Sequence, residues 1–302
     1  KPTELEDLIV MVAAFRPGPM EFIPTYIARK HGKEKVNYLH PKLAPILEST
    51  YGVAIYQEQV LKIANQLAGF TIGEADILRK AVGKKIKKLL DEQREKMIAG
   101  MINNGIDKIT SEKIWDFIEP FARYGFNRSH AACYALIAYQ TAYLKAHYPG
   151  EFMTALLNTE SFDIDRVAEL IEETKRMGID VLPPNLNESR ENFTLVKDGG
   201  STRIRFGLGA IKNLGENAVL AIMKELELGR FTELQSFLER IPSKDLNKKS
   251  LESLIKCGAL DAYGDRKTLY DNIEELLRYS KDSSRSKESP QGGLFGANIG
   301  VA

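Results

Sequence analysis

Cysteine is scarce in this chain of 302 residues, which has only Cys133 and Cys257. Two cysteines cannot build the disulfide framework of small secreted domains, so a reducing cytoplasm is the expected compartment. The formal net charge is also small, at +1, and no overall excess of one sign points to an anionic partner. With 43% hydrophobic and 27% charged residues, the chain is expected to be soluble and to hold two domains of ordinary size.

Targeting and membrane signals are missing as well. Residues 1–10 are polar and carry no signal-peptide pattern. The chain opens without Met, in sequence typical of a domain interior, which predicts a fragment of a longer protein. Residues 129–144 contain no Asp, Glu, Lys or Arg, but their tyrosines, Gln140 and His130 argue against a membrane span. We therefore expect a central, buried helix there and no membrane partner.

Charge is concentrated locally. Residues 1–150 carry 21 Lys and Arg against 16 Asp and Glu, residues 151–198 carry 5 against 11, and residues 199–302 carry 16 against 14. In the stretch "LRKAVGKKIKK", residues 78–88, six of eleven residues are basic. Any argument about an anionic ligand therefore depends on such clusters and not on the total.

Apolar periodicity predicts a mainly helical chain up to about residue 178. In residues 53–69 a short apolar entry is expected, followed by a helix that stops at Gly69. Helices are also expected over 111–125 with Ser111 as N-cap, over 129–148 with Ser129 as N-cap, and over 163–178. Next, "FTLV" and "RIRFGL" flank the turn-rich "KDGGST", which predicts a β-hairpin. Short helices are expected to about residue 280, followed by a polar, flexible linker. Domain boundaries are placed near Leu182 and Tyr279.

The basic stretch is the first candidate site. An unbroken helix would point Lys85 into the apolar side formed by Leu78 and Val82, and a helix end at Gly83 avoids this conflict. Such an end aims four basic side chains at one point, where a polyphosphate or nucleic-acid backbone would relieve their repulsion: Arg79, Lys80, Lys84 and Lys85. A solvated basic face is the alternative, and spacing does not decide between them. A P-loop is excluded, because that motif needs Gly at position 78 and Ser or Thr at position 85.

The segment "FARYGFNRSHAACYA" is the second candidate. Arg128 and the helix start at Ser129 form a positive corner that suits an anion. Phe126 and Tyr124 have rings that could stack on a base. The alternative is ordinary helix capping with core aromatic residues.

Two helix-hairpin-helix patterns form the third candidate. "IKNLGENA", residues 211–218, has glycine where a backbone must approach a phosphate closely. A second match surrounds the turn at 262–264, and a tandem pair of this kind is typical of proteins that bind the duplex DNA backbone. Two packed helical hairpins without a ligand are the alternative. The candidate DNA-binding residues are Asn213, Leu214, Gly215, Asn217, Tyr263, Gly264, Arg266 and Lys267.

The polar tail contains "QGGLFG", residues 291–296. Leu294 and Phe295 are apolar residues in otherwise polar sequence, so they either fill a gap on their own protein or enter a partner's pocket. Gln291, three residues before Leu294, favours the partner.

Several of these stretches together resemble one known family. "FRPGPM", "YGVAIYQEQVLKIA", "LRKAVGKK", "YGFNRSHAACYALIAYQTAYLKAHYP" and "GLGAIKNLGENA" occur in the same order as in the alpha subunits of bacterial DNA polymerase III, the C-family replicative polymerases. The resemblance covers essentially the whole chain. It implies a mainly α fold, with a helical fingers domain over 1–182, a tandem helix-hairpin-helix region with one β-hairpin over 183–279, and a linker with a clamp-binding peptide over 280–302.

The resemblance also implies roles for individual residues. The family's R-[RK]-A-x-G-K-K motif contacts the triphosphate of the incoming nucleotide, here through Arg79, Lys80, Lys84 and Lys85. The G-F-N-[RK]-S-H motif lies near the nascent base pair, which singles out Asn127, Arg128 and His130. The two hairpins would hold duplex DNA through its phosphates, independently of base sequence. The Q-x-x-L-F pattern of Gln291, Leu294 and Phe295 would bind the sliding clamp, although Gly292 and Gly293 depart from the usual peptide.

Catalysis in this family uses palm-domain aspartates that hold two Mg²⁺ ions, and the family's aspartate motif does not occur in this sequence. DNA-directed DNA polymerase activity, a nucleotidyl transfer with dNTP substrates, is therefore expected of the intact protein and not of this fragment alone. No metal site is expected here, since His130 and Cys133 lack a second pair of ligands. The implied partners are primer–template DNA, the sliding clamp and other replicase subunits.

Two other functions remain open at this point. The chain could be a non-enzymatic helix-hairpin-helix module that binds DNA or acts as a scaffold in a repair or replication protein. It could also be an interaction fragment that engages the clamp through residues 291–296.

Overall fold

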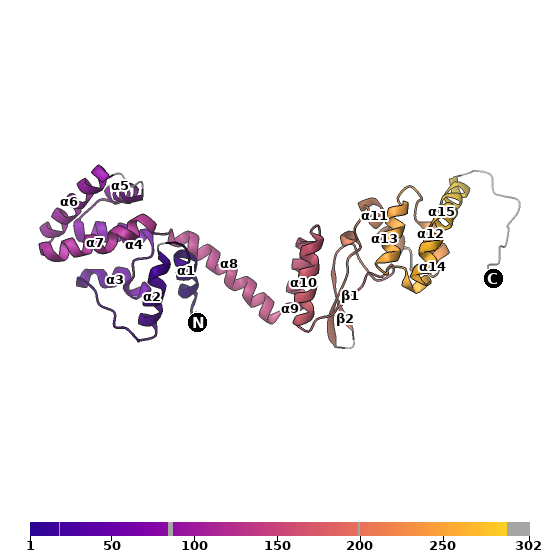
Figure 1. Ribbon diagram of the computed structural model, residues 1–302, viewed down its shortest axis with the longest axis horizontal. Coiled ribbons are helices and arrows are strands. Elements are labelled where there is room, and N and C mark those ends of the chain that lie inside the picture. Colours follow the sequence, from indigo (N-terminus) through magenta and orange to yellow (C-terminus); the bar gives the residue numbers. More distant parts are fainter. Residues whose placement is uncertain (18, 84–86, 199, 289–302) are drawn as a thin grey trace. The chain divides into compact units, whose positions relative to one another are not determined.

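The computed structural model describes residues 1–17, 19–83, 87–198 and 200–288. The chain divides into two compact units, Lys1–Ala142 and Tyr143–Ala302 (Figure 1). Helices dominate both units, and the described strands form one small sheet. The predicted fold class, mainly α with one β-hairpin, is confirmed.

The first unit contains helices and short 3-10 turns only, among its described residues. In chain order they are α1 (Leu5–Ala14), η1 (Pro19–Phe22), α2 (Ile23–Lys30), η2 (Pro41–Leu43), α3 (Ala44–Leu47), η3 (Glu48–Thr50), α4 (Gln57–Ala68), α5 (Ile72–Gly83), α6 (Lys87–Asn103) and α7 (Lys108–Tyr124), followed by α8 (Arg128–His147), within which the division between the units falls.

Helix α4 lies at the centre of the first unit and packs against α5, α6 and α7. Ile63 and Leu67 of this helix are fully buried, and Trp115 of α7 belongs to the same core. The helix ends at Gly69, which adopts a left-handed conformation with φ of 73°, as the sequence predicts. Close packing on α6 needs Gly100, because a Cβ atom there would lie 2.2 Å from the carbonyl oxygen of Ala68.

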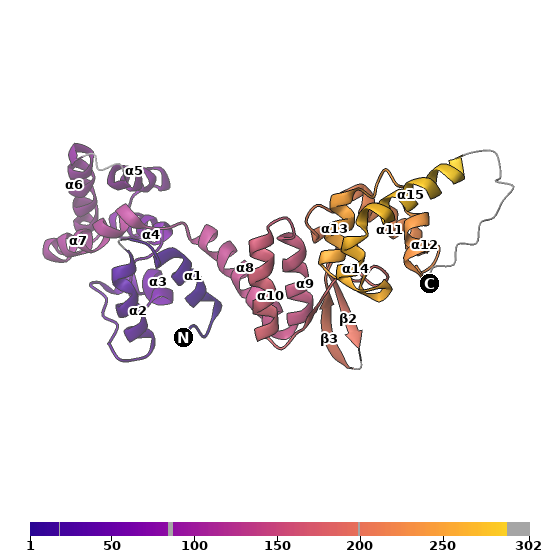
Figure 2. The ribbon, with the colours of Figure 1, turned by 45° about the vertical axis from the view of Figure 1, so that its right-hand side comes forward.

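The structure describes the basic stretch only on either side of the predicted helix interruption. Helix α5 is described as far as Gly83 and helix α6 from Lys87. The two helices run in different directions (Figure 2), so they are not parts of one straight helix. Leu78 is buried on the inner side of α5, which fixes the direction in which the helix faces the core. Lys84 and Lys85, two of the four predicted cationic residues, lie outside the described residues.

Helix α7 begins three residues earlier than predicted. Asp107 acts as its N-cap by accepting a hydrogen bond from the N–H of Thr110 at 2.9 Å. Ser111, the predicted cap, lies within the helix, and its hydroxyl donates to the carbonyl of Asp107 at 2.9 Å. Asp107 caps the helix in place of Ser111 because its carboxylate accepts the free N–H of Thr110 and also complements the positive end of the helix dipole.

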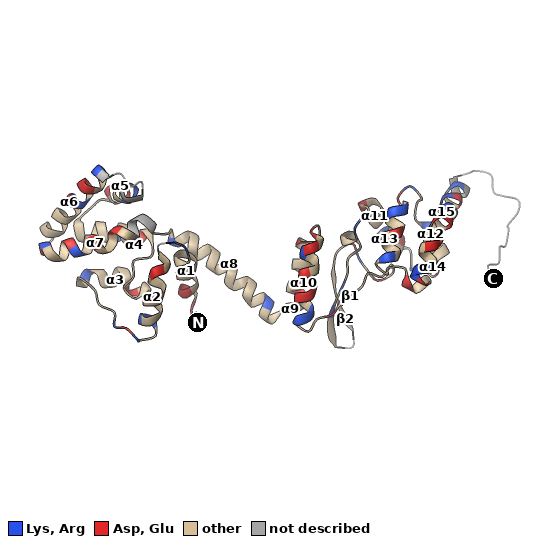
Figure 3. Ribbon diagram, in the orientation of Figure 1, with Lys and Arg blue, Asp and Glu red and all other residues tan. Residues whose placement is uncertain are grey.

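The prediction that residues 129–148 form a central, buried helix is wrong about burial. Helix α8 is present, but among its described residues only Ala131 and Ala135 are buried. Tyr134 and Ile137 are each 56% exposed. Figure 3 shows α8 almost without charged residues, in contrast to the acidic α10. An uncharged sequence makes burial possible, but burial also requires another element to cover the helix.

The second unit combines helices with a small sheet. Its elements are α9 (Pro149–Thr159), α10 (Ile164–Arg176), β1 (Val181–Leu182), β2 (Thr194–Asp198), β3 (Ser201–Arg205), η4 (Leu208–Ala210), α11 (Glu216–Glu227), α12 (Leu234–Arg240), α13 (Lys248–Lys256), η5 (Asp261–Tyr263), α14 (Arg266–Asp271) and α15 (Ile273–Glu288).

The predicted β-hairpin is confirmed as β2 and β3, which pair antiparallel with Leu195 opposite Ile204. The two-residue strand β1 was not predicted, and it pairs parallel with β3 to give the order β1-β3-β2. Helices α9 and α10 lie side by side (Figure 2) and share a core with the sheet. The side chain of Asn158 on α9 binds both main-chain groups of Phe193, with bonds of 2.7 and 3.0 Å.

These contacts place α9 and α10 with the sheet in the second unit. The predicted limit of the fingers domain at residue 182 does not coincide with this structural division, and it stays a prediction about function.

Helices α11 to α15 enclose the core of the remaining part, with Phe237, Leu251 and Leu254 fully buried. Helix α15 continues to Glu288, through residues that the sequence predicts as a flexible linker. Within this segment Ser280 is buried, and the hydroxyl of Ser284 accepts a hydrogen bond from the N–H of Ser243 at 3.4 Å.

Within the described part of the chain, no helix is both long enough and apolar enough to span a bilayer.

Candidate functional sites

The last turn of α5 carries two of the predicted nucleotide-binding residues, and both bind the same carboxylate. Nη2 of Arg79 lies 2.8 Å from Oδ1 of Asp76, and Nζ of Lys80 lies 2.7 Å from Oδ2. Hydrogen bonds from Lys80 and Arg79 lower the pKa of Asp76 below its usual value. Asp76 therefore offsets part of the positive charge of the cluster, at a surface position where such ion pairs exchange easily.

The start of α8 is the second predicted site, and its cap differs from the prediction. The side-chain oxygen of Asn127 accepts a hydrogen bond from the N–H of His130 at 2.8 Å, so Asn127 is the N-cap and not Ser129. The helix accordingly begins at Arg128. Asn127 and Ser129 are both good capping residues, and the sequence alone does not rank two such residues so close together.

The segment 125–130, called here the α8 N-terminal turn, is held by the residues that lead into α4. Tyr56 and Phe126 form an isolated parallel β-bridge. The main-chain N–H of Gln57 donates to the carbonyl of Phe126 at 3.0 Å. The side-chain amide of Gln57 donates to the carbonyl of Gly125 at 2.9 Å. Two motifs that lie some seventy positions apart in the chain, "YQEQ" and "GFNRSH", therefore meet in one place.

Carboxylates occupy the positive groups of this turn. Both oxygens of Glu58 accept from the main-chain N–H of Arg128, each at 3.1 Å. Nη2 of the Arg128 side chain lies 2.7 Å from Oε2 of Glu6. The hydrogen bond that Arg128 donates to Glu6 raises the pKa of Arg128 above its usual value. The positive corner predicted to attract an anion is thus already neutralised in part by the protein's own side chains.

Tyr56 contacts both members of the pair formed by Arg128 and Glu6. Its ring is buried and its hydroxyl donates to Oε1 of Glu6 at 3.1 Å. Burial raises the pKa of this hydroxyl, and the adjacent Glu6 carboxylate raises it further, so Tyr56 remains a neutral donor. The guanidinium of Arg128 also lies over the Tyr56 ring, 5.7 Å from its centroid.

An aromatic row extends from this turn along α8. The guanidinium of Arg16 lies 4.5 Å from the centroid of the Phe126 ring. Phe126 contacts His130 edge-on at 5.3 Å, and His130 contacts Tyr134 at 4.7 Å. His130 and Tyr134 are exposed, so their rings face outward from the unit. The sequence did not single out Tyr134, although its spacing of four from His130 on a helix is a signal that could have found it.

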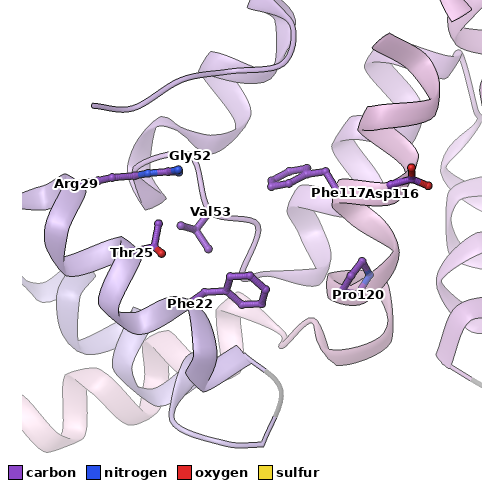
Figure 4. A pocket seen from close by; sticks show the side chains of 8 residues that line it. All are labelled: Phe22, Thr25, Arg29, Gly52, Val53, Asp116, Phe117 and Pro120. Atoms are coloured by element: carbon purple, nitrogen blue, oxygen red, sulfur yellow. The ribbon is translucent and has the colours of Figure 1, made fainter. Parts of the chain in front are cut away.

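Figure 4 shows a cavity of about 360 Å³ formed by residues of η1, α2, α7 and the loop at Gly52. The rings of Phe22 and Phe117 line it. Arg29 at its wall is already bound, because its Nε donates to Glu34 at 2.8 Å and its Nη1 donates to the carbonyl of Tyr51 at 3.2 Å. None of the described residues predicted to bind a ligand lines this cavity.

A smaller, polar cavity of about 230 Å³ adjoins the α8 N-terminal turn. Tyr56, Glu58, Lys62 and Arg128 are among the residues that line it. It therefore belongs to the site around Arg128.

The first helix-hairpin-helix match forms a tight turn before α11. Asn213 adopts a left-handed conformation with φ of 64°, and its carbonyl accepts from the hydroxyl of Ser250 at 3.1 Å. Lys212, Asn213 and Asn217 are exposed, as is Gly215, the N-cap of α11. Leu214 is buried, so its side chain anchors the turn and cannot meet a ligand. The short turn η4, and not an α-helix, precedes this hairpin.

The second match lies between α13 and α14, and two of its predicted contact residues serve the fold. The hydroxyl of Tyr263 donates to the carbonyl of Phe231 at 2.9 Å. Arg266 binds Asp261 with two parallel hydrogen bonds of 2.7 and 2.6 Å. Lys267 is exposed on α14, and Gly264 is exposed just before that helix, so both are accessible to a ligand.

Two known protein families match successive parts of the chain. The family described as "Bacterial DNA polymerase III alpha subunit finger domain" matches residues 1–105, and the family described as "Helix-hairpin-helix motif" matches residues 178–269. The DNA polymerase III subunit alpha of Thermus aquaticus is 49% identical over 301 residues, which cover 98% of this chain and 24% of that protein.

The chain belongs to the family of bacterial DNA polymerase III alpha subunits. The proteins of the same name from Borreliella burgdorferi and Deinococcus radiodurans are 45% and 43% identical, and the matches cover 98% and 97% of this chain but 26% and 22% of those proteins. The chain thus spans about a quarter of the length of the curated relatives it matches.

In this alpha-subunit family member, the structure brings "YQEQ" and "GFNRSH" together, and it places Arg79 and Lys80 at the end of α5. The predicted clamp-binding residues Gln291, Leu294 and Phe295 lie outside the described residues. Over the described part of the chain, no three His, Cys, Asp or Glu side chains gather in a way that could hold a metal ion.

Proposed function

We propose that this chain is the part of a replicative DNA-directed DNA polymerase that holds the incoming deoxynucleoside triphosphate and grips duplex DNA. The observation that carries the proposal is the 49% identity, over 98% of the chain, to a protein named DNA polymerase III subunit alpha. Nucleotidyl transfer with dNTP substrates, primer–template DNA as partner, and Mg²⁺ as cofactor are proposed for the intact protein. Its place of action would be the cytoplasm.

In this proposal Arg79, Lys80, Lys84 and Lys85 bind the triphosphate. The position of Arg79 and Lys80 on the described part of α5, next in sequence to Lys84 and Lys85, supports the assignment. Charge-assisted contacts from several cations are what a triphosphate needs, since its own charges repel one another. Asp76 releases Arg79 and Lys80 when the phosphates arrive.

Asn127, Arg128 and His130 lie near the nascent base pair in this proposal. Asn127 acts through the fold, because its side chain caps α8. Arg128 offers a half-exposed cation, and His130 offers an exposed ring next to that of Tyr134. A cation and a π surface together suit a nucleotide, which has both a charged and an aromatic part.

The hairpin turns would grip duplex DNA through its phosphates. The exposed residues Lys212, Asn213, Gly215, Asn217 and Lys267 support this role. Leu214, Tyr263 and Arg266 shape the turns that present them. Gln291, Leu294 and Phe295 are proposed to bind the sliding clamp, and other replicase subunits would join the same assembly.

A double substitution tests the triphosphate assignment in the intact alpha subunit. Lys84→Ala combined with Lys85→Ala should raise KM for dNTP by at least about 10-fold and leave duplex affinity unchanged. If the residues form a general DNA patch, as in a non-enzymatic helix-hairpin-helix module, duplex binding weakens instead and its salt dependence flattens. Lys108→Ala with Lys113→Ala, on the exposed side of α7, is the matched control.

The 302-residue chain alone is proposed to be inactive in primer extension, because phosphoryl transfer needs metal ions that neutralise charge as well as residues that position the nucleotide. Sustained nucleotide incorporation by the purified chain would refute this part of the proposal.

A further inference from the structure

We propose that Glu58 is a positioning residue for Arg128 in the nucleotide site, an inference that rests on the function proposed above. Glu58 lies in the first turn of α4, and both of its carboxylate oxygens accept from the main-chain N–H of Arg128 at 3.1 Å. It thereby acts on the first residue of α8 from a helix far away in the sequence.

The carboxylate changes what the start of α8 can bind. A free helix N-terminus attracts anions through its unpaired N–H groups and the helix dipole. Here Glu58 takes the N–H of Arg128, and Asn127 takes the N–H of His130. Two N–H groups of the helix end are therefore already bound, and the half-exposed guanidinium of Arg128 is the cation of this turn that can meet a phosphate or a base.

Side-chain amides hold the segment that leads into Glu58, residues 55–57, which is called here the platform. The side-chain oxygen of Gln59 accepts from the N–H groups of Ile55 and Tyr56 at 2.8 and 3.0 Å. Its amide donates to the hydroxyl of Thr50 at 2.8 Å, and Gln59 is itself buried. Gln57 holds the carbonyls of the turn on the other side. Because the platform is rigid, the Glu58 carboxylate fixes where the turn lies.

Glu6 completes the positioning of the arginine. It binds Nη2 of Arg128 at 2.7 Å and also accepts from the hydroxyl of the buried Tyr56. Glu58 thus sets the main chain of Arg128, while Glu6 sets the direction of its side chain. Groups that act on a bound substrate lose much of their effect when they shift by about 1 Å, so fixing both ends has a direct functional value.

A purely structural role for Glu58 would predict something different. If it only stabilised α8, its loss would affect the enzyme to the same degree whether or not the guanidinium of Arg128 were present. If it positions that guanidinium, the effect of its loss depends on Arg128. A double-mutant cycle separates the two cases.

The experiment measures KM for dNTP and kcat in the intact alpha subunit. Glu58→Ala should raise KM about 10-fold with little change in kcat, and Glu58→Gln, which keeps an acceptor oxygen, should stay within about 3-fold of the parent. In the Arg128→Ala background, Glu58→Ala should change KM by less than about 2-fold. Glu48→Ala, on the neighbouring turn η3, is the control for loss of a nearby carboxylate.

Two outcomes overturn the inference, and they differ in what else they overturn. If Arg128→Ala raises KM but Glu58→Ala does not, or acts equally in both backgrounds, only the positioning role is lost. If Arg128→Ala itself leaves KM unchanged, the proposed place of Arg128 at the nucleotide fails as well. Thermal unfolding of each variant shows whether the protein remains folded.

Discussion

Nζ of Lys80 lies 2.7 Å from Oδ2 of Asp76, four residues earlier on helix α5. The same carboxylate also binds Arg79, so one acidic residue holds two of the cations proposed to meet the triphosphate. The pair is exposed to solvent, which makes its exchange for a phosphate inexpensive. Asp76 therefore competes with the nucleotide for these side chains.

Replacing Asp76 by Asn should remove this competition. In the intact alpha subunit, Asp76→Asn is expected to lower KM for dNTP by about 2- to 5-fold, and the effect should shrink as salt screens the charges. Glu112→Gln is the matched control, since Glu112 faces Lys108 with the same spacing on α7. A KM that rises in Asp76→Asn would mean that the carboxylate orders the cations for binding and does not compete.

The ion pair between Asp7 and Lys30 predicts how stability depends on pH. Burial alone would raise the pKa of Asp7, but hydrogen bonds from Lys30, Thr3 and Tyr26 lower it to about 2. A lowered pKa means that the stabilisation is fully present above the ordinary value near 4 and is lost as the pH falls toward 2. The loss should amount to about 2 kcal/mol in the free energy of unfolding.

Urea unfolding of this chain at pH 5 and at pH 2.5 measures that loss. Asp7→Asn should be less stable at both values, because the buried Lys30 then keeps only the more exposed Glu4 as its carboxylate partner. It should also lose the part of the pH dependence that comes from this carboxylate. An unchanged pH slope in Asp7→Asn would assign the acid sensitivity to other groups.

Much of the fold could be predicted from local sequence signals. Gly69 as a helix stop and the hairpin of β2 and β3 each depend on residues that are neighbours in the chain. In each of these cases the deciding residue and the structure it decides lie within a few positions of each other. Such local rules need no knowledge of the tertiary fold.

The site could be predicted only in part, because its decisive contacts join distant segments. No local pattern links Glu6 to Arg128 or Glu58 to the start of α8, because 122 and 70 positions separate the two members of these pairs. The same limit explains the wrong prediction about α8, since an uncharged helix is compatible with burial but does not reveal which element covers it. The same limit explains why the sequence predicts Arg266 as a DNA contact, whereas in the fold Arg266 is bound by Asp261.

Gly100 offers a direct test of the close approach of α6 to α4. A Cβ atom at this position would lie 2.2 Å from the carbonyl oxygen of Ala68, so one of the helices must move. Gly100→Ala should therefore destabilise the first unit by about 2–3 kcal/mol despite the better helix propensity of alanine. Gly73→Ala in α5 is the control, because open space surrounds that position, and it should stabilise slightly. Equal melting temperatures for the two variants would show that α6 adjusts without cost.

Arg266 and Lys267 are neighbours with the same charge, yet the structure assigns them different roles. The guanidinium of Arg266 donates two parallel hydrogen bonds to Asp261 and lies against Gly258, where a Cβ atom would come within 2.2 Å of Nη2. Lys267 is exposed on α14. A phosphate contact by Lys267 should release about one counterion, whereas Arg266 is already neutralised by its partner.

Binding of a short DNA duplex to this chain, followed by fluorescence anisotropy between 50 and 200 mM salt, separates the two roles. Lys267→Ala should weaken binding by about the same factor for every duplex sequence and reduce the slope of log K against log salt by about 1. Arg266→Ala should leave that slope unchanged and instead lower the stability of the second unit, because Asp261 then loses its partner. The reverse result would place the DNA phosphates at Arg266 and require its pair with Asp261 to open on binding.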